Sequence, residues 1–78
     1  MGKATTASLT VSLPAYNEEH NIGAMIDRVR DQVGPLVDDL EIIVVDDGSR
    51  DGTADVVARI AAEDPGVRLI RHEVNQGY

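Results

Sequence analysis

Four polar residues that could do chemistry follow directly on an apolar run near the middle of the chain. The run is EIIVV, and it is followed at once by Asp46, Asp47, Ser49 and Asp51. Ser49 or Asp51 could cap a following helix, and acids near the positive helix end would add to a stabilisation of about 1 kcal/mol. Capping does not explain two adjacent aspartates. Because consecutive strand residues point to opposite faces, we expect one aspartate to contact loop backbone and the other to face a cleft.

Several common acidic or glycine-rich motifs do not fit this loop. An EF-hand would place Asp47, Ser49 and Asp51 at its first, third and fifth positions, but its twelfth position is Ala58 instead of glutamate. A P-loop would need a lysine that GSRDGT lacks, and a dinucleotide motif would need GxGxxG after the first strand. Neighbouring carboxylates on one strand also cannot face each other across a sugar, as a glycosidase requires.

A carboxylate fixed at the end of a strand does suit the recognition of a nucleotide base. It accepts a hydrogen bond from the ring N–H of uracil or guanine, whereas adenine and cytosine present a bare acceptor at that position. Such a bond contributes about 1.5–3 kcal/mol, which is enough to discriminate between bases. Tyr16 could pack its ring against the base or be a core packing residue. Glu18 could accept a ribose hydroxyl or be a first-turn acid favoured by the helix dipole.

The composition describes one small domain of 78 residues. Fourteen acidic against seven basic residues give a net charge of -7, which disfavours nucleic acid as a partner. The chain has no cysteine, which excludes disulfides and thiolate zinc sites and fits a reducing compartment. No apolar run approaches the roughly 18–20 residues that cross a bilayer, and the opening residues lack the apolar segment of a secretory signal. We therefore expect a cytoplasmic domain with a loose tail at residues 1–7.

The residue pattern predicts the elements that position these side chains. Residues 8–14 alternate between apolar and polar, which indicates a strand that Pro14 ends. LEIIVVD is a continuous β-branched run, typical of a strand covered on both faces, and VRLIR predicts a third strand. Apolar residues at helical spacing predict one helix that Asn17 or Asn21 caps and Gly34-Pro35 ends, and a second over residues 52–63.

The order β-α-β-α-β predicts an α/β fold. Right-handed crossovers would build a Rossmann-like parallel sheet with helices on its faces. Ligands of such sheets bind beyond the carboxyl ends of the strands. Both PAYNE and DDGSRDG follow predicted strands and would lie side by side there if the first two strands pair.

Three stretches together resemble the N-terminal part of the family 2 glycosyltransferases, especially the dolichyl- and undecaprenyl-phosphate sugar synthases. They are VSLPAYNEEHNIG, LEIIVVDDGSRDGT and VNQGY, and the similarity runs from about Leu9 to Tyr78. The resemblance implies a GT-A type fold and an inverting transfer of a sugar from a UDP- or GDP-sugar to an acceptor such as a polyprenyl phosphate. The residues it places at the nucleoside are Pro14, Ala15, Tyr16, Glu18, Val45 and one of Asp46 and Asp47, of which we favour Asp47.

The family's catalytic half is not in this sequence. The resemblance implies a later Asp-x-Asp that contacts Mg²⁺ or Mn²⁺ and the sugar, and a further aspartate that acts as base. We therefore expect residues 8–78 to be a partial nucleotide-sugar-binding domain with no catalytic residue or metal ligand, inactive as a transferase on its own. Any membrane contact would come from parts outside it. We expect His20 and His72 to be isolated and exposed, and Arg68 and Arg71 to be solvated edge charges.

Two other classes of protein remain open. A receiver-like regulatory module would bind Mg²⁺ through its acidic cluster, but it would also need acids after the first strand, where this chain has PAYN. A small interaction domain would use the carboxylates only as helix caps. For the partial glycosyltransferase domain, a 3-2-1 strand order would leave the first strand without the neighbour that the rest of the domain provides. Its alternating apolar residues would then form an open sheet edge, which invites self-association with a second copy.

Overall fold

A computed structural model describes residues 8–72 of the chain. The predicted loose tail at residues 1–7 and the VNQGY stretch lie outside the described residues. The element order is β-α-β-α-β, as predicted. None of the described helices is long and apolar enough to cross a membrane. The elements are β1 (Ser8–Ala15), α1 (Ile22–Val33), a 3₁₀ turn η1 (Gly34–Leu36), β2 (Asp39–Asp47), α2 (Thr53–Glu63) and β3 (Val67–His72).

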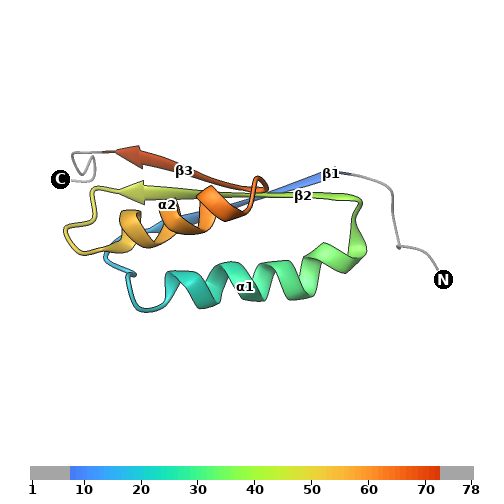
Figure 1. Ribbon diagram of the computed structural model, residues 1–78, viewed down its shortest axis with the longest axis horizontal. Helices are drawn as coiled ribbons and strands as arrows, with labels where there is room; N and C mark the ends of the chain where they lie inside the picture. Colours follow the sequence, from blue (N-terminus) through green and yellow to red (C-terminus); the bar gives the residue numbers. More distant parts are fainter. Residues whose placement is uncertain (1–7, 73–78) are drawn as a thin grey trace.

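The three strands form one parallel sheet in the order β1-β2-β3, and both helices lie on the same side of it (Figure 1). Two right-handed crossovers that step across a sheet in the same direction place their helices in this way. Along β2, Ile42 and Val44 are buried, whereas Ile43 and Val45, which point to the other face, are half-buried. The expectation of helices on both faces, with the central strand covered on both sides, is therefore wrong for the described residues.

The core lies between the two helices and the covered face of the sheet. Ile22 and Ile26 of α1 and Val57 of α2 are fully buried, and they cluster with Ile42 and Val44 of β2. Met25 and Val29 pack at the margin of this cluster. The core residues of α1 and α2 come from the apolar stripes that the helical spacing predicted, because residues three and four apart share one face of a helix.

Local boundaries differ from the predictions in two places. β1 continues through Pro14 to Ala15; proline is tolerated there because β1 is an edge strand, where not every N–H needs a ladder partner. Asn21 stands at the start of α1 without a side-chain cap, and Asn17 takes a left-handed φ of 53° in the preceding loop. The predicted end of α1 at Gly34-Pro35 is confirmed, since the helix passes into a 3₁₀ turn there.

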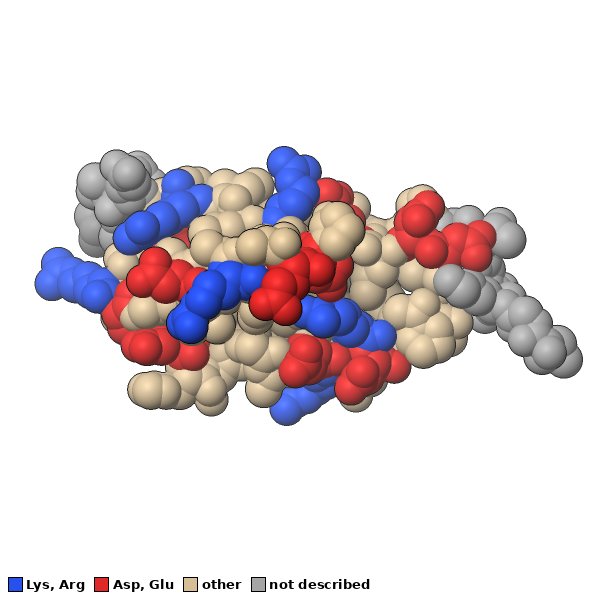
Figure 2. All heavy atoms as spheres, viewed as in Figure 1, with Lys and Arg blue, Asp and Glu red and all other residues tan. Residues whose placement is uncertain are grey.

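Charged side chains are interspersed by sign on the surface. Figure 2 shows acidic and basic groups intermixed on the face that it displays. Arg30 lies 3.4 Å from Asp64 and Arg68 lies 3.2 Å from Glu41. Surface pairs of this kind contribute roughly 0–1 kcal/mol each, so the stability of the described domain depends mainly on its core.

Candidate functional site

The loops that follow β1 and β2 lie side by side at the carboxyl end of the sheet, as predicted. Direct hydrogen bonds join them: the N–H of Asn17 donates to Ser49 Oγ at 2.8 Å, and the N–H of Arg50 donates to Asn17 Oδ1 at 2.9 Å. The N–H of Glu18 donates to Thr53 Oγ1 at 2.8 Å. The start of α2 therefore holds the backbone of the loop that carries Tyr16.

Glu19 makes a pair of reciprocal hydrogen bonds that also connect the loops after β1 and β2. Its N–H donates to Asp51 Oδ2 at 3.2 Å, and its own Oε1 accepts from the N–H of Gly52 at 3.1 Å. A Cβ at Gly52 would come within 2.8 Å of Glu19 Oε2, so a larger residue here would push the Glu19 carboxylate away from the Gly52 N–H. Sequence reasoning missed Glu19, because its partners lie more than 30 residues away and leave no local pattern.

Asp46 is the aspartate of the pair that contacts loop backbone. Its side chain is 0% exposed and lies on the helix-covered side of β2. Its Oδ1 accepts hydrogen bonds from the hydroxyl of Ser49 and, at 3.3 Å, from the N–H of Ser49. Gly48, with φ 75°, provides the left-handed turn that brings Ser49 back to Asp46. Ser49 is therefore bonded to Asp46 and Asn17, and the prediction of Ser49 as a helix cap is wrong.

Arg71 completes the surroundings of Asp46. Its Nε lies 3.5 Å from Asp46 Oδ2, and the two residues face each other across the β2–β3 ladder. The expectation that Arg71 is merely a solvated edge charge is therefore wrong. A cation beside a buried carboxylate compensates part of the cost of removing that charge from water.

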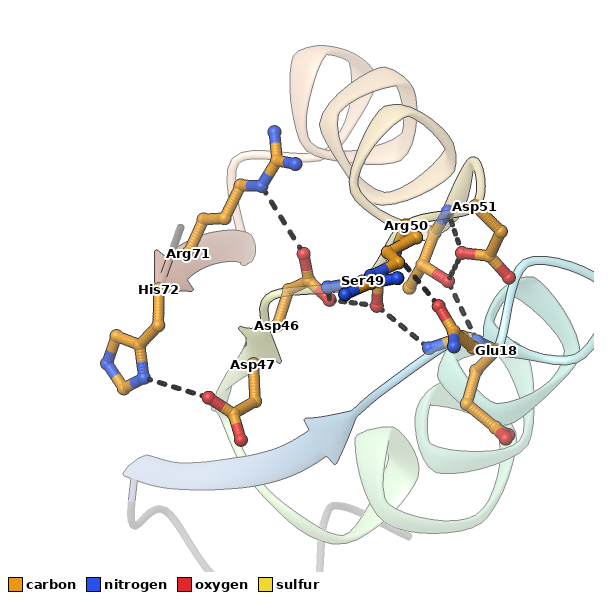
Figure 3. A network of polar contacts seen from close by, with 10 residues as sticks. Glu18, Asp46, Asp47, Ser49, Arg50, Asp51, Arg71 and His72 are labelled. Atoms are coloured by element: carbon orange, nitrogen blue, oxygen red, sulfur yellow. Dashed lines mark hydrogen bonds and ion pairs between the residues drawn. The ribbon is translucent and has the colours of Figure 1, made fainter. Parts of the chain in front are cut away.

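Asp47 points to the opposite side of β2, and Figure 3 shows the two neighbouring carboxylates leaving the strand in different directions. It lies at a pocket of about 680 Å³ at the carboxyl end of the sheet. Of the predicted nucleoside-binding residues, only Asp46 does not line this pocket. The pocket is lined by Pro14, Ala15, Tyr16, Glu18, Val45, Asp47 and His72.

Tyr16 and Glu18 have surroundings that favour a site over a purely structural role. Tyr16 is 47% exposed, so its ring is not a core packing element. Glu18 precedes α1, whose first turn contains no acid, so the alternative of a first-turn acid is wrong. Both side chains line the pocket from the loop whose backbone is bonded to the start of α2.

His72 is the pocket residue that sequence reasoning missed. β3 pairs with β2 in a register that places His72 opposite Asp47, and its Nδ1 lies 3.7 Å from Asp47 Oδ1. The sequence suggested an isolated and exposed histidine. The imidazole is half-exposed, but it is not isolated, because it lies beside Asp47. The position of His72 at the pocket follows from the register of β3 against β2, which no single stretch of sequence specifies.

The described acids do not form a metal site. Between residues 8 and 72, no group of three or more His, Cys, Asp or Glu side chains is arranged to hold a metal ion. Asp46 is turned away from the pocket toward Ser49 and Arg71. Asp46 and Asp47 therefore do not form a joint acidic cluster in the described structure.

Asp51 makes the contact that begins α2. Gly52 occupies the cap position without a side-chain bond, and Asp51 Oδ1 instead accepts from the N–H of Thr53 at 2.9 Å. The Thr53 hydroxyl, followed by backbone N–H groups of Thr53 and Glu19, holds the pKa of Asp51 below its ordinary value of 3.8. Asp51 thus serves the start of the helix, one residue before the cap position.

We expect the stability of the domain to depend on the ionisation of Asp51. Because its pKa is lower in the folded state, the carboxylate stabilises the fold above its unfolded pKa, and this contribution is lost as pH falls through the folded pKa. Urea unfolding of wild type and Asp51→Asn should therefore differ more at pH 7 than at about pH 2. Asp31→Asn, an exposed acid on α1 away from the first turn of the helix, is the control. An equal difference at both pH values would contradict the assignment.

Comparison with known proteins identifies the family. The family model described as Glycosyl transferase family 2 matches residues 10–78. Over 70 residues the chain is 39% identical to an undecaprenyl-phosphate 4-deoxy-4-formamido-L-arabinose transferase of Serratia proteamaculans, with 90% of this chain and 21% of that protein covered. It is 36% identical over 66 residues to the succinoglycan biosynthesis protein ExoA of Rhizobium meliloti, with 85% and 19% covered. The chain spans about a fifth of the length of these curated relatives.

The family match covers both loops and every residue of the pocket. The parallel β-α-β-α-β sheet is consistent with the N-terminal part of a GT-A fold. The chain belongs to glycosyl transferase family 2.

Proposed function

We propose that this chain is the nucleoside-binding part of a glycosyltransferase whose donor is a UDP- or GDP-sugar. The observation that carries the proposal is the pocket in which the Asp47 carboxylate and the exposed Tyr16 ring lie together beyond the ends of β1 and β2. Parallel α/β sheets bind their ligands at this edge. The pocket thus offers both a charged acceptor and an aromatic surface to one planar ring.

Each predicted nucleoside-binding residue has a defined part in this proposal. Asp47 accepts the hydrogen bond of the ring N–H of uracil or guanine, and the Tyr16 ring packs against the base. Glu18 accepts a ribose hydroxyl. The apolar surface against which the nucleoside lies is provided by Pro14, Ala15 and Val45. Asp46 acts indirectly by fixing the loop that follows β2.

We propose the following reaction for a whole glycosyltransferase of which this chain would be a part. Seven of the relatives are named as undecaprenyl-phosphate 4-deoxy-4-formamido-L-arabinose transferases, which supports a polyprenyl phosphate acceptor. We propose that the transfer proceeds with inversion at the sugar, as the family resemblance implies. Mg²⁺ or Mn²⁺ would neutralise the donor diphosphate, but residues 8–72 offer it no ligand set. We therefore propose that residues 8–78 form a partial domain that binds the donor nucleotide and does not transfer the sugar. It would lie in the cytoplasm, with any membrane contact made by other segments.

Calorimetric titration of the 78-residue chain with UDP, GDP, CDP and ATP tests the proposed function. We expect UDP or GDP to bind more tightly than CDP and ATP, because only uracil and guanine donate a ring N–H to Asp47. A preference for ATP would refute the proposal that Asp47 accepts a hydrogen bond from the ring N–H of uracil or guanine. Phosphorylation by acetyl phosphate would instead favour a receiver-like module, and the absence of any nucleotide binding would favour an interaction domain.

We also propose that the chain self-associates through β1. In the described sheet β1 pairs on one side only, with β2, and Leu9 is 43% exposed. An open edge with apolar side chains favours pairing with another strand. Light scattering should therefore show a mass that rises with concentration. Ser12→Lys on β1 should reduce this rise, whereas Gln32→Lys, which adds the same charge on α1, should not. A monomer at all concentrations would contradict the proposal.

A further inference from the structure

The position of His72 gives the pocket a second polar group directly beside Asp47. The parallel register of β2 and β3 sets the two residues opposite each other, on the sheet face that carries no described helix. His72 Nδ1 and Asp47 Oδ1 are 3.7 Å apart, which exceeds the roughly 2.7–3.2 Å of a hydrogen bond. The two groups therefore stand next to each other at the pocket.

The sheet keeps the neighbouring charges away from this pair. Arg71, the next residue along β3, points to the covered face and lies 3.5 Å from Asp46. Arg68 lies on the same face of β3 as His72 but 3.2 Å from Glu41, at the opposite end of the strand. Glu18 is the other acid that lines the pocket. His72 is thus the basic side chain at the carboxylate that faces the base in the proposed function.

The ring edge of uracil and guanine presents two groups in a fixed order. A donating ring N–H stands directly beside an accepting carbonyl oxygen. A carboxylate satisfies only the first of these groups. A complete match needs one acceptor and one donor side by side on the protein, and an imidazole carries at least one N–H in either protonation state. The Asp47 and His72 pair has this composition.

We infer that His72 is a base-specificity residue that donates a hydrogen bond to the carbonyl oxygen next to the ring N–H bound by Asp47. This inference rests on the proposed function and adds a second determinant to it. Cytosine and adenine present an amino group where uracil and guanine present the carbonyl, so a donor at His72 also disfavours them. His72 and Asp47 together select the N–H and C=O order of the base edge.

The test compares oxygen and sulfur at the position that His72 would contact. Wild type and His72→Ala are titrated with UDP and 4-thio-UDP, and with GDP and 6-thio-GDP, because O4 of uracil and O6 of guanine are the carbonyl oxygens that cytosine and adenine replace by an amino group. Sulfur is a weak hydrogen-bond acceptor, so wild type should prefer one oxygen base over its thio analogue by about 3- to 10-fold. His72→Ala should lose this preference. Other effects of sulfur, such as a more acidic ring N–H, act on both proteins and cancel in the cycle.

Two further variants separate recognition from structure. His72→Gln keeps an N–H donor and should restore part of the preference. Arg68→Ala removes an exposed basic residue from the same face of β3 and should leave the preference unchanged. If His72→Ala keeps the wild-type preference while UDP or GDP still binds in an Asp47-dependent manner, this inference is overturned and the proposed function stands. If wild type binds neither UDP nor GDP, both fail.

Discussion

Asp47→Asn is expected to lower the affinity of the chain for UDP or GDP by about 10- to 150-fold. The substitution replaces a charged acceptor by a neutral amide of the same size, and a hydrogen bond to a charged group contributes more than one to a neutral group. Asp47 is half-exposed at the pocket, so the free energy of unfolding should change by no more than about 0.5 kcal/mol. Calorimetric titration at constant salt measures the first effect and urea unfolding the second.

The control for Asp47→Asn must remove the same charge away from the pocket. Asp31→Asn does so on the exposed surface of α1. Because the chain has a net charge of -7, each neutralised acid slightly reduces the general repulsion of a diphosphate. Asp31→Asn should therefore leave affinity equal or slightly higher. If Asp47→Asn and wild type bind the nucleotide with equal affinity, Asp47 does not contact the base, and the prediction is wrong.

Asp46→Ala is expected to destabilise the fold by about 2–4 kcal/mol, far more than the change at its neighbour. The side chain is 0% exposed, and its removal leaves the hydroxyl and N–H of Ser49 without their acceptor. Arg71 loses its partner, but it is half-exposed and can be solvated, so most of the loss comes from Ser49. Chemical denaturation followed by circular dichroism measures the effect.

Two companion variants divide this loss between the contacts of Asp46. Arg71→Met removes only the cation and leaves the buried Asp46 carboxylate without its counter-charge. It should cost roughly 2–3 kcal/mol, less than the ~3–5 kcal/mol expected for a fully buried pair because Arg71 itself is half-exposed. Asp46→Asn keeps an acceptor for Ser49 but places an amide near Arg71, so its stability should lie between those of wild type and Asp46→Ala. A fully stable Asp46→Ala would show that the buried network does not hold the loop. A loss of nucleotide affinity in that variant would reflect the loop, because Asp46 does not line the pocket.

The sequence alone determined the element order and the place of the pocket that forms the candidate site. Helical and strand periodicities are local properties, so the apolar stripes of α1 and α2 and the runs of β1 and β2 could be read directly. Two polar loops that each follow a parallel strand must meet at one edge of the sheet. The alternation of side chains along a strand also divided Asp46 from Asp47 into different surroundings. Every predicted nucleoside-binding residue except Asp46 lines the same pocket.

Only the tertiary structure decided the contacts that depend on the placement of one strand against another. The one-sided helices follow from the order β1-β2-β3, which no single segment specifies. The register of β2 and β3 brings Arg71 to Asp46 and His72 to Asp47, although the sequence suggested a solvated charge and an isolated histidine. The contacts of Glu19 with Asp51 and Gly52 likewise join residues more than 30 positions apart. The pattern within a helix or strand predicts on which face of that element a side chain lies. Its contact partner on that face depends on how the elements pack against each other.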